Sequence, residues 1–111
     1  MPVMCLYRAL KVTPEAYDAV RAAVDWEGDV PPGAIGHFIA FRDGEAVEAD
    51  IWESQAAYQL YRDSRLNPVL DRMGLVIDEP EILDLHVAAI GAPAAQAYVV
   101  PRAITPACAP A

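Results

Sequence analysis

Basic residues are scarce in this sequence. Its 111 residues include 8 lysines and arginines against 16 aspartates and glutamates, which gives a formal net charge of −8. A surface of that sign repels phosphate backbones and anionic lipid headgroups. We therefore expect neither a nucleic acid nor a membrane surface among the partners of this protein.

Cysteine and long apolar runs are also lacking. The two cysteines, Cys5 and Cys108, have neither the number nor the spacing of a disulfide framework or a zinc site, so both are expected to be free thiols. No uncharged apolar run approaches the roughly 20 residues of a membrane-spanning helix. The first residues also lack the apolar core and cleavage site of a secretion signal. These absences predict a soluble, cytoplasmic protein.

Cofactor motifs are absent as well. The sequence contains no glycine-rich phosphate loop, haem-attachment motif or flavin fingerprint, so no nucleotide, haem or flavin cofactor is expected. With 55% hydrophobic and 22% charged residues, the composition is typical of one compact domain. Any function must therefore be inferred from where polar residues fall in the apolar pattern.

The order of strand-like and helix-like segments predicts an α+β fold. An Asp43-Gly44 turn between two strand-like runs indicates a hairpin, and Pro68 predicts a break within the second helix. The order βαββαβ is the ferredoxin-like arrangement, a four-stranded antiparallel sheet with both helices on one face. The expected strands span residues 2–11, 34–41, 46–52 and 82–89, and the expected helices span 14–24 and 54–73.

Residues 1–90 form the predicted domain, and residues 91–111 form an extension rich in alanine and proline. Such a composition is typical of a flexible tail. Within the segment from Ala97 to Val100, the residues Tyr98-Val99-Val100 are the part of the extension with β propensity. We expect this segment to lie extended against a partner subunit or an open sheet edge; immobilisation by lattice contacts alone is the competing interpretation.

Counting back from the hairpin turn divides the sheet into two faces. The count pairs His37 with Asp50 and Ile35 with Trp52. The aliphatic face is expected to pack under the helices, and it carries Met4, Leu6, Leu10, Phe38, Ala40, Val47, Ala49, Ile51, Leu83, Leu85 and Val87. The mixed face should pack against the sheet of a second copy. The resulting cavity is expected to be lined by Cys5, Tyr7, His37, Ile39, Glu48, Asp50, Trp52, Asp84 and His86.

The chain has a histidine on a predicted strand, a hairpin, a run of an acidic residue, Trp, Glu and Ser that leads into a helix, and a later Leu-x-Pro. These features lie in PGAIGHFIAFRDGEAVEADIWESQAAYQLYRDSRLNPVLDRMGL, which is followed by EPEILDLHV. Over residues 1–90 the chain resembles the dimeric α/β-barrel superfamily, which includes antibiotic-biosynthesis-monooxygenase-like and stress-responsive A/B-barrel proteins. The resemblance implies a homodimer whose two sheets close into a barrel. It also implies a small-molecule ligand, and activities such as cofactor-independent quinol oxygenation, polyketide cyclisation or isomerisation.

The facing pair His37 and Asp50 is the sharpest candidate for catalysis. A carboxylate opposite an imidazole fixes its tautomer and raises its basicity, as a general base requires. Tyr7, Glu48, Trp52 and His86 are the expected substrate-binding residues. Two alternatives stay open: the pair is a satisfied structural contact, or His37, His86 and one of Glu48, Asp50 or Asp84 form a metal site.

These residues predict a small-molecule enzyme that abstracts a proton with His37 and promotes oxygenation or cyclisation of an aromatic, quinol or polyketide-like substrate. The alternative is a non-catalytic, small-ligand-binding or stress-related dimeric protein. A cavity of roughly 300 Å³ or more, large enough for a ring system, favours catalysis or ligand binding.

Overall fold

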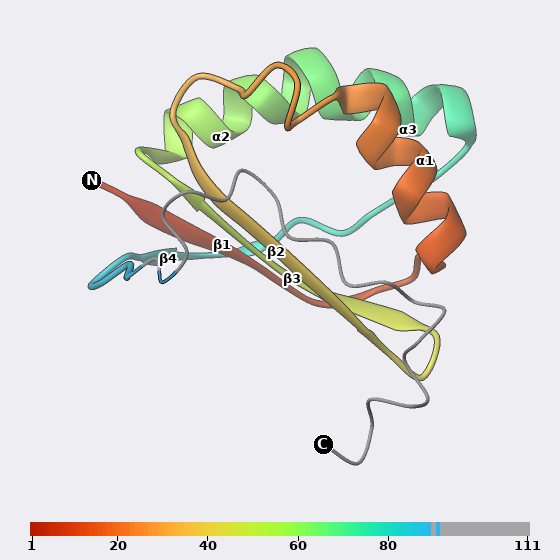
Figure 1. The fold of residues 1–111 in the computed structure, drawn as a ribbon, viewed down its shortest axis with the longest axis horizontal. Coiled ribbons are helices and arrows are strands. Elements are labelled where there is room, and N and C mark those ends of the chain that lie inside the picture. Colours follow the sequence, from red (N-terminus) through yellow and green to blue (C-terminus); the bar gives the residue numbers. More distant parts are fainter. Residues whose placement is uncertain (90, 92–111) are drawn as a thin grey trace.

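The computed structural model describes residues 1–89 and 91, which form one antiparallel sheet with helices packed on one side of it (Figure 1). The strands follow the order β2-β3-β1-β4. This is the predicted ferredoxin-like arrangement, which is confirmed. The strands are β1 (Val3–Leu10), β2 (Ala34–Arg42), β3 (Glu45–Trp52) and β4 (Glu81–Asp84), and the helices are α1 (Pro14–Val24), α2 (Gln55–Tyr61) and α3 (Asn67–Met73).

The helix starts follow the capping signals in the sequence. Thr13 precedes α1, and its hydroxyl accepts a hydrogen bond from the amide of Ala16 at 3.0 Å. Ser54 does the same for α2 through the amide of Ala57. Side-chain oxygens at these positions satisfy amides that have no partner within the helix. None of the helices in residues 1–89 is long and apolar enough to cross a membrane.

The β2–β3 hairpin has the predicted turn and register near its tip. Asp43 and Gly44 have φ values of 46° and 78°, as a two-residue turn of type I′ requires. His37 lies opposite Asp50, as expected. The predicted pairing of Ile35 with Trp52 is wrong, because Ala34 pairs with Trp52 and the register shifts before Gly36. Ile35 is the extra residue of this bulge, which counting by twos from the turn does not detect.

The break predicted in the second helical segment is a widened turn. Residues Arg62–Leu66 form a π-helical segment between α2 and α3, in which the Asn67 amide bonds to the carbonyl of Arg62. Pro68 has no amide hydrogen to donate, so the regular hydrogen-bond ladder is interrupted at this point. Helix α3 ends at Gly74, as predicted. Gly74 has a left-handed conformation.

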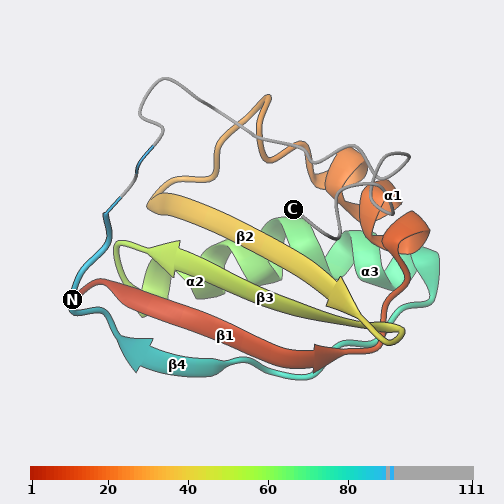
Figure 2. The same ribbon diagram turned by 60° about the horizontal axis from the view of Figure 1, so that its bottom comes forward.

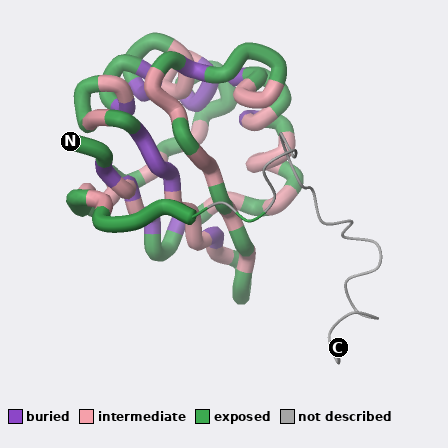
Figure 3. The backbone as a smooth tube through the Cα atoms, turned by 60° about the vertical axis from the view of Figure 1, so that its left-hand side comes forward, coloured by how far each residue is buried: buried purple, intermediate pink, exposed green. Residues whose placement is uncertain are grey.

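The predicted assignment of the two sheet faces is wrong except at Leu10, which is buried beside the cavity under the helices as predicted, because the β1 register shifts after Tyr7. The mixed face lies under the helices, where Cys5, Tyr7 and Trp52 are buried, whereas Phe38 on the aliphatic face is 54% exposed. Figure 2 shows that α1, α2 and α3 all lie on the same side of the sheet. Figure 3 colours the backbone by burial, and buried residues alternate with half-buried ones over residues 3–7 of β1. The prediction placed the mixed face against a second copy, but its ionisable groups are buried under the helices of the same chain, where they have bonding partners.

Two further predictions change with this result. The expected cavity between two sheets is replaced by one inside a single protomer, between the sheet and its helices. Strand β4 ends at Asp84, not at residue 89, because β1 begins at Val3 and offers no further strand partner beyond it. His86 is therefore beyond the strand and exposed. The contacts predicted for Ala97 to Val100 lie outside the described residues.

The turn before β2 generates a prediction about stability. Gly33 has a φ of 84°, and a Cβ there would lie 2.6 Å from the Cβ of Ala57; Gly44 has a similar φ with open space around it. Gly44→Ala should therefore cost about 1 kcal/mol through backbone strain. Gly33→Ala should cost about 1 to 3 kcal/mol more through overpacking. Urea unfolding of both variants measures the difference, and equal losses would contradict the clash.

Candidate functional site

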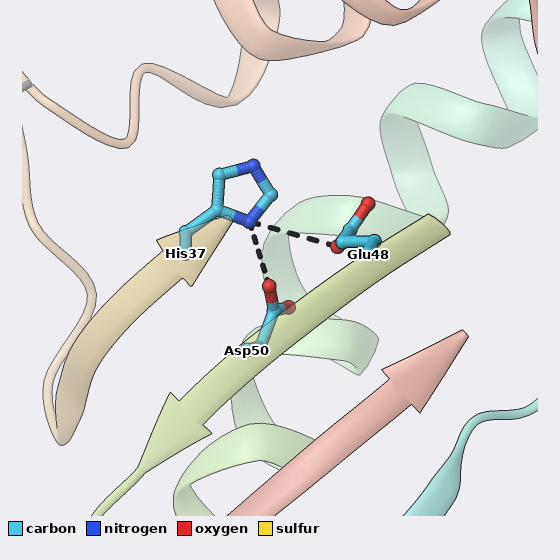
Figure 4. A group of neighbouring side chains, drawn as sticks. All are labelled: His37, Glu48 and Asp50. Atoms are coloured by element: carbon cyan, nitrogen blue, oxygen red, sulfur yellow. Dashed lines mark hydrogen bonds and ion pairs between the residues drawn. The ribbon is translucent and has the colours of Figure 1, made fainter. Parts of the chain in front are cut away.

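His37 on β2 is hydrogen-bonded through both of its ring nitrogens. Its Nδ1 lies 2.6 Å from Oδ1 of Asp50 on β3, and its Nε2 lies 2.6 Å from the hydroxyl of Tyr17 on α1. Figure 4 shows the imidazole directed toward the two carboxylates of β3. The register that places residues 37 and 50 opposite each other therefore produces the predicted pair. Its position under α1 was not predicted.

Glu48 is the third ionisable member of this cluster. It lies two residues before Asp50 on the same strand face, and its Oε2 is 3.6 Å from Nδ1 of His37. Burial, the charge of Asp50 and a hydrogen bond with Asp50 raise the pKa of Glu48 well above its ordinary value. Glu48 therefore holds its proton more tightly than a free carboxyl group does, and when protonated it can donate a hydrogen bond to Asp50.

The partners of His37 fix the direction of its hydrogen bonds. Oδ1 of Asp50 accepts the Nδ1 hydrogen, which leaves the lone pair on Nε2. Burial raises the pKa of the Tyr17 phenol above its ordinary range, so this phenol keeps its proton and donates it to Nε2. The imidazole is thus held in the tautomer whose Nε2 can accept a proton.

Aromatic rings surround the imidazole on the helix side. The ring of Trp26, in the loop after α1, lies 5.1 Å from that of His37 and 5.6 Å from that of Tyr61 on α2. Trp52 packs behind Trp26 at 5.4 Å and is fully buried. Rings in such contacts are stiff and apolar, so they exclude water from one side of the base.

A cavity of about 60 Å³ opens beside this cluster. Its polar lining includes His37, Glu48 and Asp50, and its lining also includes the exposed Lys11 and Val76, so it reaches the surface near the ends of β1 and α3. Apolar side chains of α1, α3 and the α3–β4 loop complete the wall. The volume is well below the roughly 300 Å³ of a ring-sized ligand site, so the reacting end of a ligand fits but a whole ring does not.

The other predicted substrate-binding residues do not line this cavity. The Tyr7 hydroxyl lies 2.7 Å from that of Tyr58, which accepts a hydrogen bond from the buried Arg62 at 2.8 Å. Trp52 lies behind Trp26. His86 is exposed beyond β4, so the structure does not bring the two histidines together.

The buried Arg62 belongs to the widened helical turn. Besides Tyr58, its guanidinium donates to Oδ1 of Asn67 at 2.8 Å and lies 3.2 Å from a carboxylate oxygen of Glu79. The network ends at Tyr7, which is paired across the strands with Glu48. It therefore supports the carboxylate cluster from the side opposite His37.

The same cluster has the ligand types of a metal site. His37, Glu48 and Asp50 offer one ligand atom each, and these atoms lie within 4.8 Å of one another. A nitrogen with two carboxylate oxygens suits Fe, Zn or Mn by ligand type. The metal site predicted with His86 is not formed, because His86 lies outside the cluster.

Sequence reasoning missed Tyr17, Trp26, Tyr61 and Arg62. Tyr17 and Tyr61 follow the apolar spacing of their helices, which favours ordinary core packing. Trp26 lies in a loop with glycines and prolines nearby. Their relation to His37 becomes visible only after the helices are placed on the histidine-bearing face.

No protein-family model and no curated protein matches the sequence. Among solved structures, the Mycobacterium tuberculosis protein Rv0793 is similar with a TM-score of 0.50 and 19% identity, covering 82% of this chain and 99% of that one. A putative antibiotic biosynthesis monooxygenase from Chloroflexus aurantiacus J-10-fl has a TM-score of 0.49 and 17% identity, covering 81% and 95%. At these identities the likeness to Rv0793 establishes the fold alone.

The protonation of Glu48 predicts how stability depends on pH. In the unfolded chain this carboxyl titrates near 4.5, whereas its pKa in the folded protein is well above that value. The unfolded state therefore loses its proton first, and stability falls as the pH rises from about 4.5 through the folded pKa, by up to about 1.4 kcal/mol per pH unit. Glu48→Gln should remove this loss, so the variant gains stability relative to the wild type as the pH rises.

Urea unfolding from pH 4 to pH 8 measures this relative gain. Glu53→Gln is the matched control, because Glu53 is exposed near the end of the same strand. A constant difference between Glu48→Gln and the wild type across this range would show that Glu48 is ionised in the folded protein.

Proposed function

We propose that this protein is a cofactor-independent acid–base enzyme for a small aromatic, quinol or polyketide-like substrate, with His37 as the general base. The observation that carries the proposal is the double hydrogen bonding of His37, with Asp50 on Nδ1 and a phenol on Nε2. A base held in one tautomer beside an aromatic-walled cavity has the geometry that proton abstraction requires.

The common chemical step is removal of a proton from a hydroxyl or an activated carbon of the substrate. His37 becomes an imidazolium, and the adjacent carboxylate of Asp50 stabilises its positive charge. The electron-rich substrate anion then reacts with dioxygen and supplies all the electrons, so that one oxygen atom enters the substrate and the other leaves as water, which is oxygenation. Alternatively, the anion attacks an electrophilic carbon of the same molecule, which gives cyclisation. Trp26 and Tyr61 contribute the apolar walls that limit reprotonation by water.

A non-catalytic, ligand-binding role is the second candidate. The full hydrogen bonding of His37 favours it, because both ring nitrogens already have protein partners, as in a structural contact. In that role the His37–Asp50 pair would be a structural contact between β2 and β3. The two functions differ in whether His37 changes its protonation state when a ligand binds.

We further propose a homodimer formed through the open face of the sheet. Phe38 is 54% exposed and Leu83 is 37% exposed on the side that no helix covers. The strand registers place the half-buried Met4 and Leu6 on this same face. A second copy of the face would remove these aliphatic groups from water.

Substitution of His37 tests the catalytic proposal. Two probes are suitable: para-nitrophenol, which is yellow when ionised, and a naphthoquinol, whose reaction with dioxygen an oxygen electrode follows. The wild type should increase phenolate absorbance on binding and accelerate oxygen uptake. His37→Gln should lower that rate by about 10²-fold or more, the contribution of a general base.

His86→Gln is the control, because the second histidine is exposed outside the cavity. Treatment with EDTA separates the acid–base mechanism from a metal-dependent one, which would lose activity with the metal. Binding of para-nitrophenol that leaves it protonated in both the wild type and His37→Gln would support the ligand-binding role instead.

Light scattering at micromolar concentration tests the dimer. Phe38→Asp places a charge on the open face, so the wild type should have twice the 12.0 kDa chain mass and the variant should be a monomer. Leu60→Asp, at a residue 61% exposed on α2, is the matched control. A wild-type monomer at this concentration would refute the proposed interface.

A further inference from the structure

Tyr17 occupies the atom of His37 that the proposed reaction needs. Its hydroxyl lies 2.6 Å from Nε2, and the planes of the two rings differ by 13°. The short contact between nearly parallel rings brings the phenol to the nitrogen edge of the imidazole, where the lone pair lies. A substrate therefore reaches Nε2 directly only if Tyr17 first moves away.

The surroundings of Tyr17 oppose such a movement. Its ring contacts the edge of Phe41 on β2 at 6.0 Å and the ring of His37 at 5.9 Å. The helix that carries it is fixed at its other end, where Arg65 donates a hydrogen bond to the carbonyl of Val24. Displacing the phenol would break contacts to two rings on the sheet.

The hydroxyl of Tyr17 has unused hydrogen-bonding capacity. A phenol donates one hydrogen bond and can accept through its oxygen lone pairs. The donated bond goes to His37, and Tyr17 also lines the cavity. An acidic hydroxyl entering the cavity can thus donate to the oxygen of Tyr17 with no rearrangement of the site.

We propose that Tyr17 is a catalytic residue that relays the substrate proton to His37. The proton of the substrate hydroxyl transfers to the Tyr17 oxygen while the original Tyr17 proton transfers to Nε2. The O–H bond of the substrate and that of Tyr17 break, and a new O–H bond and an N–H bond form. The products are a substrate anion, a neutral tyrosine and an imidazolium paired with Asp50. No electrons leave the substrate in this step.

This inference rests on the proposed role of His37 and makes its geometry more specific. The high pKa of Tyr17 means that a free phenolate does not accumulate, so the two protons move together. The reacting atom of the substrate binds at the Tyr17 oxygen and not at the imidazole. A cavity of about 60 Å³ then suffices for the reacting end, while the rest of the substrate extends past Lys11 and Val76.

Tyr17→Phe tests the relay because it keeps the ring and removes the hydroxyl. Its rate of naphthoquinol oxidation should fall by about 10²-fold or more, as for loss of a general acid–base group. The variant should still bind para-nitrophenol, measured by quenching of tryptophan fluorescence, but should form less phenolate. The ¹⁵N signal of Nε2 in His37 should shift, with His86 as the internal reference.

A proton inventory of the wild type in mixtures of light and heavy water supplies a test that needs no variant. Two protons moving together predict a curved dependence of the rate on the deuterium fraction, and a single proton predicts a straight line. A straight line, or full activity of Tyr17→Phe with an inactive His37→Gln, overturns the relay and leaves the proposed function intact. Full activity of His37→Gln, or a wild type that acts on neither probe, overturns both.

Discussion

The structure depends on burying His37, Glu48 and Asp50 together beneath helices. An isolated carboxylate or imidazole is costly to remove from water, so these groups are stable there only as a set of mutual hydrogen bonds. Antiparallel register supplies that set, since His37 and Asp50 lie opposite each other and Glu48 follows on the same face. The raised pKa of Glu48 favours retention of its proton, which lowers the cost of burying two carboxyl groups side by side, and the Nδ1 hydrogen of His37 bonds to Asp50.

A second network fixes the helices above this cluster. Arg62 lies inside the protein and bonds to Tyr58 and Asn67, and Tyr58 in turn bonds to Tyr7. The π-helical turn lacks some of the hydrogen bonds of a regular α-helix. The buried guanidinium of Arg62 offsets part of this loss, because it bonds to Tyr58 before the turn and to Asn67 after it. The irregular segment next to Pro68 is therefore part of the support of the site.

Local features could be predicted from the sequence, and the choice of sheet face could not. The caps Thr13 and Ser54, the Asp43-Gly44 turn and the His37–Asp50 register depend on a few neighbouring residues, and the structure confirms them. The burial of one face depends on contacts between distant segments. The aliphatic face had the usual composition of a core, whereas the mixed face is buried because Tyr17, 20 residues from His37 in sequence, completes its hydrogen bonds. For the same reason Tyr17 was not recognised as a site residue.

The charges near the cavity favour a substrate that enters in its neutral form. Lys11 and Arg21 line the cavity, but each already forms an ion pair, with Glu45 and Glu27 respectively. Among the described residues, the other groups of the cavity lining that commonly carry a charge are the carboxyl groups of Glu48 and Asp50 and the imidazole of His37, which is bonded to Asp50. The whole protein carries a net charge of −8. An anionic ligand would meet repulsion on entry. A neutral phenol or enol avoids this repulsion. It becomes an anion only after proton transfer, and the imidazolium of His37 then stabilises the new negative charge.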